Sequence, residues 1–167
     1  MAELTQQERL QPSLLDRLTD DDPAAKSESS EKRFLSLRQL RQAVIRDLRW
    51  LFNTGAIASV EPLGDYPELI PSVINYGIPD ISGSLVSNID IRTLERQIKQ
   101  AIFDFEPRIL RRTLTVKAII NREDMSPSAV AFEISADVWG QPGPSHLYLK
   151  TEMDLETGTA TVTDMGG

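Results

Sequence analysis

The sequence predicts an α+β fold: two main helices packed on one face of an antiparallel sheet of about four strands, with a flexible N-terminal extension. The spacing of apolar residues carries this prediction. In two stretches before residue 106 they recur every three or four positions, as on the buried face of a helix. From residue 110 onward they alternate by two, as in strands. Helices followed by a series of strands are typical of helices that cover one face of an antiparallel sheet.

The 167 residues, of which 40% are hydrophobic and 26% charged, suffice for one domain with an ordinary core and an extension. We expect the extension to cover residues 1–31 and a single α+β domain to cover residues 32–167. Within the extension, Leu14, Leu15 and Leu18 lie on one side of a short amphipathic helix, and an acidic linker follows. This composition predicts either that the leucine cluster is a tethered anchor that docks on a partner, or that it packs on its own domain.

Charge is unevenly distributed at the start of the chain. Residues 1–31 carry eight acids and three bases, a balance of −5, whereas residues 32–49 carry six bases and one acid, a balance of +5. Both regions are solvated surfaces in one interpretation. In the other, the basic face is covered by the acidic extension or by an acidic partner.

The first main helix is expected to begin at Ser36. Its apolar stripe consists of Leu37, Leu40, Val44, Leu48, Leu51 and Phe52. Asn53, Thr54 and Gly55 are expected to end it, because glycine most readily takes the left-handed conformation after a last turn. Four aromatic residues are expected to be packing rather than binding residues: Trp50, Tyr66, Tyr76 and Trp139.

Prolines and glycines forbid a long regular element between residues 56 and 89, yet this stretch is too apolar for a solvated loop. We therefore expect an ordered crossing with one short helix near residues 72–76. Asn88 or Asp90 then caps the second main helix, which runs to Phe105.

Glu106, Pro107 and Arg108 join the helical region to the sheet. Proline disfavours helical dihedrals at the residue before it and cannot donate a ladder hydrogen bond. Glu106 should therefore end the helix and Arg108 should start the first strand. Because the proline ring restricts the chain, the two charges are expected to be held at one edge of the domain, where a partner can reach them.

The expected strands are residues 110–120, 130–138, 147–155 and 159–163, with a tight return at residues 156–158. The last strand is short and leaves a sheet edge open, which is a natural site for adding a strand from another chain. Thr159, Thr161 and Thr163 are its expected partner-binding residues.

The sequence contains few of the residue patterns that catalysis, metal binding or cofactor binding requires. There is no cysteine and a single histidine, which excludes thiolate and multi-histidine zinc sites, and no phosphate-binding loop or nucleophile elbow occurs. Asp104 and Glu106, the nearest pair of carboxylates for a glycosidase, should diverge at positions i and i+2 of a helix end. We expect no catalytic residue, metal, cofactor or small-molecule substrate. No apolar run approaches the roughly 18 residues of a membrane span, so the protein is expected in the cytoplasm without membrane insertion.

A series of motifs resembles a known family. They are the stretches 12–18 (PSLLDRL), 20–23 (DDDP), 46–54 (RDLRWLFNT), 66–67 (YP), 72–80 (SVINYGIPD) and 105–108 (FEPR). Their order and spacing are similar to those of TssE, the baseplate subunit of the bacterial type VI secretion system. TssE is in turn similar to the baseplate wedge proteins of contractile-tail phages, which carry a lysozyme-like label.

The resemblance implies a non-enzymatic structural subunit, present in each baseplate wedge and bound to the other wedge subunits. It implies that the sheet joins the wedge to the contractile sheath and templates the first sheath ring by pairing strands. Glu106, Pro107 and Arg108 would belong to the contact between wedge components.

Two other function classes remain open. A glycan hydrolase would turn over peptidoglycan, and Glu106→Gln would abolish the turnover. A nucleic-acid-binding module would use the basic residues between Lys32 and Arg49 and would be retained on DNA in a salt-dependent way. The net charge of −7 argues against nucleic acid as a partner.

Overall fold

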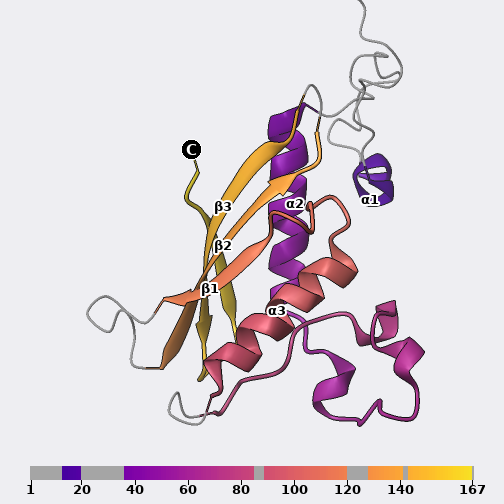
Figure 1. Cartoon of the computed structure of the whole chain (residues 1–167), viewed down its shortest axis with the longest axis vertical. Helices are drawn as coiled ribbons and strands as arrows, with labels where there is room; N and C mark the ends of the chain where they lie inside the picture. Colours follow the sequence, from indigo (N-terminus) through magenta and orange to yellow (C-terminus); the bar gives the residue numbers. More distant parts are fainter. Residues whose placement is uncertain (1–12, 20–35, 85–88, 120–127, 141–142, 167) are drawn as a thin grey trace, which may run out of the picture.

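The computed structural model describes residues 13–19, 36–84, 89–119, 128–140 and 143–166. Its elements in chain order are α1 (Leu14–Leu18), α2 (Leu37–Phe52), the short 3-10 helices η3 (Ile57–Ser59), η4 (Pro67–Leu69) and η5 (Val73–Asn75), α3 (Ile91–Phe105), β1 (Thr115–Ile119), β2 (Ala129–Val138), β3 (Ser145–Asp154) and β4 (Ala160–Asp164). The strands form an antiparallel sheet in the order β1-β2-β3-β4, and α2 and α3 cover one of its faces (Figure 1). The α+β fold predicted from the sequence is confirmed.

The core lies between the sheet and the apolar faces of α2 and α3. Its fully buried side chains include Leu48 and Phe52 of α2, Ile98 and Ile102 of α3, and Phe132, Ile134 and Leu149 of the sheet. Each buried side chain of this size contributes about 1.5–3 kcal/mol relative to leaving it in water. Alternate residues of β2 and β3 face this core, which confirms the two-residue period read from the sequence.

Capping side chains fix where the long helices begin. Ser36 Oγ accepts a hydrogen bond from Gln39 N at 3.2 Å, and the Gln39 side chain accepts one from Ser36 N at 2.9 Å. Asp90 accepts hydrogen bonds from the main-chain N–H groups of residues 92 and 93 and so caps α3. The expected start of both helices is confirmed, while the alternative cap Asn88 lies outside the described residues.

α2 ends where expected, at residues 53–55, but not through the expected glycine conformation. Gly55 does not take a left-handed conformation, so that part of the prediction is wrong. Asn53 closes α2 instead: its main-chain N–H bonds to Arg49 O at 3.2 Å, and its Nδ2 donates to the same oxygen at 2.7 Å. The side-chain amide thus gives the Arg49 carbonyl a second donor at the end of the helix.

The first strand also begins later than expected. Residues 107–113 lie mostly in turns and β1 begins at Thr115, so Arg108 does not start a strand and the alternation predicted from residue 110 does not hold there. Thr113 accounts for the delay, because its Oγ1 accepts a hydrogen bond from Asp137 N at 2.9 Å. A threonine hydroxyl thereby takes the place of a main-chain carbonyl of a longer strand.

Three of the aromatic residues expected to pack inside are exposed. Trp50 is 51% exposed, Trp139 50% and Tyr66 57%, so the prediction that they are packing residues is wrong. Trp50 lies on the outer side of α2, where the Arg46 guanidinium stacks 5.2 Å from its ring centroid. Tyr76 does pack, with its ring edge-on to Phe105 at a centroid distance of 5.2 Å.

The crossing between α2 and α3 is ordered, as expected, and η5 is its predicted short helix. The crossing has two arms, the segment that leaves α2 at residues 54–56 and the segment at Ile78. Main-chain hydrogen bonds from Ala56 N to Ile78 O and from Ile78 N to Thr54 O, both 2.9 Å, join them. Gly77 makes this approach possible. Its φ is +136°, and a Cβ at this position would lie 2.8 Å from Ala56 N.

Gly77→Ala should therefore destabilise the domain by about 1–3 kcal/mol, since alanine would be strained at this φ and would collide with the opposite arm. Thermal unfolding measures the loss. Gly64→Ala is the matched control, because nothing lies within 4 Å of a Cβ there and Gly64 has no positive φ. Equal melting temperatures for the two variants would contradict the role given to Gly77.

Candidate functional site

The junction at residues 106–108 contains an ion pair between Glu106 and Arg108. Glu106 ends α3, as expected, and is only 4% exposed. Arg108 N and Nε donate to Glu106 Oε1 at 3.1 and 2.7 Å, and Arg108 Nη2 donates to Glu106 Oε2 at 2.5 Å. Pro107, between the two, is exposed. The turn at the proline therefore folds the arginine back onto the carboxylate that precedes it.

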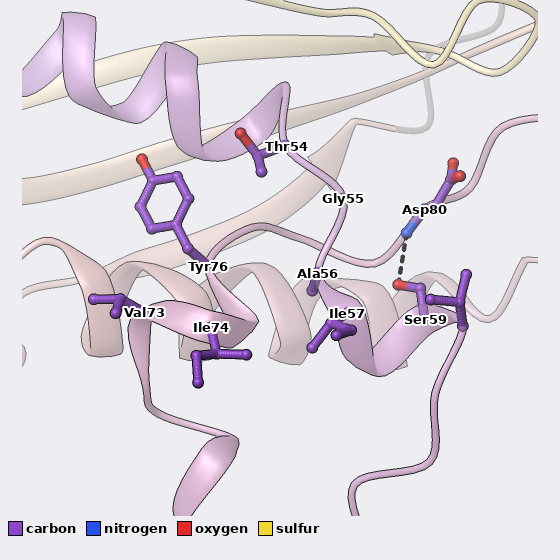
Figure 2. Close-up of a pocket in the computed structure, with 10 residues that line it drawn as sticks. Thr54, Gly55, Ala56, Ile57, Ser59, Val73, Ile74, Tyr76 and Asp80 are labelled. Carbon is purple, nitrogen blue, oxygen red and sulfur yellow. Dashed lines mark hydrogen bonds between the residues drawn. The ribbon is translucent and has the colours of Figure 1, made fainter.

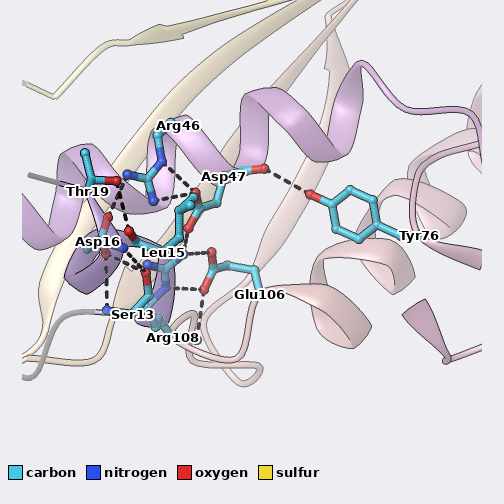
Figure 3. Close-up of polar contacts among 9 residues, drawn as sticks. All are labelled: Ser13, Leu15, Asp16, Thr19, Arg46, Asp47, Tyr76, Glu106 and Arg108. Atoms are coloured by element: carbon cyan, nitrogen blue, oxygen red, sulfur yellow. Dashed lines mark hydrogen bonds and ion pairs between the residues drawn. The ribbon is translucent and has the colours of Figure 1, made fainter. Parts of the chain in front are cut away.

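The ion pair of Glu106 and Arg108 is one end of a chain of alternating charges (Figure 3). Arg108 Nη2 is also 2.5 Å from Asp47 Oδ2, and Asp47 Oδ1 lies 2.8 Å from Arg46 Nη2. Arg46 Nη1 in turn contacts Asp16 Oδ1 at 2.6 Å. The five side chains join α1, the middle of α2 and the end of α3, so one ionic network connects all three helices.

The network shifts the pKa values of Arg108 and Asp16. Burial lowers the pKa of Arg108, but the carboxylates of Glu106 and Asp47 outweigh it, and the pKa ends well above its ordinary value. Burial likewise raises the pKa of Asp16, but hydrogen bonds from Ser13 and Arg46 outweigh it, and the pKa falls below its ordinary 3.8. Both shifts favour the charged forms of Arg108 and Asp16.

The expectation that a partner can reach both charges at the edge of the domain is wrong for Glu106, whereas the Arg108 side chain is 22% exposed. Glu106 is buried, and both its oxygens are bonded to Arg108. What the junction presents to solvent is Pro107 and part of Arg108. A groove of about 540 Å³ beside it is lined by Leu15, Leu40, Trp50, Tyr76, Phe105 and Pro107, among others. The site is thus an apolar hollow resting on a buried ionic network.

The leucines of α1 do not pack into the core of their own domain. Leu14 is 71% exposed and Leu18 74%, while Leu15 is 42% exposed and lines the groove. The ion pair from Asp16 to Arg46 holds α1 against α2, and Ser13 caps α1 through Asp16. The acidic linker expected after α1 lies outside the described residues, so its flexibility remains a prediction.

On β4, the threonine side chains are exposed, but their main-chain groups do not all lie at the free edge. Asp154 N donates to Thr159 O and Met165 N donates to Tyr148 O, which fixes the hydrogen-bonded pairs of the β3–β4 ladder. By the alternation of an antiparallel ladder, the main-chain groups of Thr161 and Thr163 pair with β3. The outward groups belong to Ala160, Val162 and Asp164.

Side chains of α2 cover part of this edge. Asn53 Oδ1 accepts from Ala160 N and Asn53 Nδ2 donates to Ala160 O, both at 2.9 Å. Arg49 Nη2 donates to Val162 O at 3.1 Å. Sequence reasoning missed Arg49 and Asn53, because their role depends on a strand more than a hundred residues away. It had treated Asn53 only as part of a helix end.

Three residues on the outer face of the sheet stand in the order of a catalytic triad. His146 Nδ1 is 2.9 Å from Asp137 Oδ1, and His146 Nε2 is 3.4 Å from Ser135 Oγ. However, β2 is paired on both sides, so the main-chain N–H groups beside Ser135 are used in ladders and do not offer an oxyanion site. The histidine side chain is also 64% exposed. These contacts are those of ordinary cross-strand polar neighbours.

The other chemistries considered from the sequence find no constellation in the described part of the chain. Glu106 is bound to Arg108 and Asp104 accepts from Gln100, so the two carboxylates do not face one cleft. Among the described residues, no group of three or more histidine, cysteine, aspartate or glutamate side chains could hold a metal ion. No helix of the described segments is long and apolar enough to cross a membrane.

Comparison with protein-family models gives a match over residues 38–143 to a model described as baseplate wedge protein gp25. The match covers more than half of the chain and contains α2 except its first residue, together with α3, the 106–108 junction, β1 and β2. No curated protein and no solved structure matches the chain.

Arg108→Met should lower the stability of the isolated subunit by about 3–5 kcal/mol, because Glu106 and Asp47 lose the cation they share in a partly buried network. Chemical denaturation measures this loss. Arg112→Met, the same change at an exposed position, is the control and should leave stability nearly unchanged. Similar small effects in both variants would mean that the network adds little to the fold.

Docking of α1 should depend on pH through Asp16. The pKa of Asp16 is lowered in the folded chain, so its stabilising effect is complete above about pH 5 and is lost as pH falls through the lowered pKa. Trp50 fluorescence, recorded in a Trp139→Phe background, follows the release because Arg46 stacks on Trp50. In Asp16→Asn the acidic transition should be absent; an unchanged transition would assign it to another group.

Proposed function

The chain belongs to the family of baseplate wedge protein gp25, and from this premise we propose that it is the TssE-like wedge subunit of a type VI secretion baseplate. The family gives it a structural role in assembly with other baseplate subunits. We propose further that it acts in the cytoplasm without enzymatic activity. Its residues 1–31 would form an extension from the assembling domain 32–167.

The proposed contact with other wedge subunits is the apolar hollow at the 106–108 junction. Pro107 is exposed there, and Leu14, Leu18 and Trp50 present apolar side chains to solvent nearby. Arg108 Nη1 is a buried donor without a hydrogen-bond partner among the described residues. An unpaired buried donor is costly, and a carbonyl or carboxylate of a partner would satisfy it if docking moved the groups that cover this nitrogen. Glu106 then acts indirectly, by holding Arg108 in place.

The proposed contact with the sheath is the free edge of β4. β4 pairs only with β3 in the described sheet, and this one-sided pairing is the observation that carries the proposal. An extended segment of a sheath subunit would add to the outward groups of Ala160, Val162 and Asp164. The exposed side chains of Thr159, Thr161 and Thr163 would border that segment.

Strand addition at this edge requires that Asn53 and Arg49 give way. A side-chain amide carries the same N–H and C=O groups as a peptide unit, so Asn53 imitates one residue of a neighbouring strand at Ala160. An incoming strand would replace the hydrogen bonds of Asn53 and Arg49 with main-chain ones. Until then, the side chains reduce the risk of edge-to-edge association.

Val162→Pro tests the sheath contact. It removes an outward N–H without removing a bond of the β3–β4 ladder, so it should block sheath attachment while wedge assembly persists. Val162→Ala is the matched control, since it also loses the buried valine side chain but keeps the N–H. Thr161→Pro is a poorer test, because the Thr161 N–H belongs to the ladder.

The readout is sheath formation on reconstituted baseplates, observed by electron microscopy, with melting temperatures for both variants. Sheath attachment in Val162→Ala but not in Val162→Pro, at comparable stability, is the expected result. Normal sheath growth on Val162→Pro baseplates would remove the strand-pairing proposal. Turnover of peptidoglycan by the wild-type chain would instead overturn its non-enzymatic assignment.

A further inference from the structure

The crossing between α2 and α3 reverses the usual burial of polar and apolar residues. In η5, the polar Asn75 is only 8% exposed, whereas Val73 is 82% exposed and Ile74 61%. A short helical turn of this composition would ordinarily bury the two β-branched residues and expose the amide. The reversal keeps two apolar side chains in water.

This arrangement is held rigidly. Asn75 Oδ1 accepts a hydrogen bond from Ala58 N at 3.0 Å, and Asn75 Nδ2 donates to Ile70 O at 2.9 Å. The buried amide thereby ties η5 to the neighbouring turns, and the main-chain hydrogen bonds around Ile78 tie the two arms together. Val73 and Ile74 are therefore displayed by an ordered scaffold rather than by a loose loop.

The two side chains border a groove of about 550 Å³ (Figure 2). Its apolar lining consists of Ile57, Val60, Val73, Ile74 and the ring of Tyr76, with smaller residues between them. Val60 is 78% exposed, and Ile70 and Tyr66 on the same crossing are 46% and 57% exposed. Exposed apolar side chains gathered in this way mark a contact surface.

Charge on the crossing has one sign. Residues 56–84 contain four acids and neither lysine nor arginine. The acids are Glu61, Asp65, Glu68 and Asp80, and all four are exposed. Among the described residues, Asp80 is the one charged residue that lines the groove. A segment that carries lysine or arginine beside its apolar residues would complement this surface, whereas an acidic segment would be repelled.

We propose that this groove binds a segment of another baseplate subunit that carries large apolar side chains flanked by lysine or arginine. The inference rests on the family's role in baseplate assembly and adds a surface to it. The surface uses none of Glu106, Pro107 or Arg108 and none of β4. Tyr76 lines both this groove and the hollow at the 106–108 junction, so the two surfaces adjoin and can serve one continuous wedge contact.

The probes are the purified wedge subunits of the same secretion system, titrated one at a time and as a complex against the immobilised full-length chain. A double variant, Val73→Ser with Ile74→Ser, should weaken binding by about ten-fold or more if these residues are anchors of the contact. Its melting temperature should not fall, because the deleted side chains lie mainly in water. Met165→Ser, which also removes an exposed apolar side chain, is the control and should bind normally.

A second variant tests the charge of the partner. Replacing Glu61, Asp65 and Glu68 by their amides should weaken binding several-fold at about 0.1 M salt, and the difference should shrink at about 0.5 M salt because exposed charges are then screened. Unchanged binding in this variant would overturn the basic character assigned to the partner.

Three further outcomes separate the ideas. If the wild-type chain binds wedge subunits and the double variant binds equally well, the groove proposal fails while the proposed function stands. If the wild-type chain binds no wedge subunit, both fail. If sedimentation shows that the wild-type chain dimerises and the double variant does not, the occupant is a second copy of the chain, and the proposed partner is wrong.

Discussion

The chain of alternating charges from Asp16 to Glu106 is the interaction on which the arrangement of the helices depends. Burying a carboxylate such as Glu106 is costly unless a cation bonds to it directly, and Arg108 does so through both guanidinium and main-chain donors. Arg108 reaches Glu106 because Pro107 ends α3 with a turn, and it reaches Asp47 because α2 packs beside it. One electrostatic requirement therefore fixes the end of α3, the rotation of α2 and, through Arg46, the position of α1.

Helix α2 and the residue that follows it also bond to β4. Arg41 binds the carboxylate of Asp164 with both Nε and Nη2, and Arg49 and Asn53 bond to the main chain of β4. Three arginines of the basic stretch, Arg41, Arg46 and Arg49, are therefore paired inside the chain. This pairing explains why a basic helix in an acidic protein need not be a nucleic-acid surface. Only the pair of Arg46 with Asp16 matches the expectation that the acidic extension covers the basic face, because Arg41 and Arg49 bond to β4.

Periodicity alone predicted the helices, the strand series and the covered face of the sheet, because the burial of alternate or every third to fourth residue is a local pattern. What it could not predict depends on residues far apart in the chain. Glu106 was expected to be reachable at the edge of the domain, but it is buried because Arg108 bonds to both its oxygens, and Asp47, about sixty residues before Arg108, binds the same guanidinium. Trp50 was expected in the core, but the apolar stripe of α2 was already complete without it. Asn53 gave no signal of its second role before the register of β4 was known.

The three proposed contact surfaces differ in what binding demands of them. The hollow at Pro107 and the groove at Val73 are already open and apolar, so a partner gains burial there without displacing a bond of the subunit. The edge of β4 is closed by Asn53 and Arg49, and an added strand must first compete with their hydrogen bonds. Wedge contacts should therefore form readily between free subunits, whereas strand pairing needs a partner that supplies several main-chain bonds together. Under the proposed function, this difference in cost favours assembly of the wedge before the sheath is joined to it.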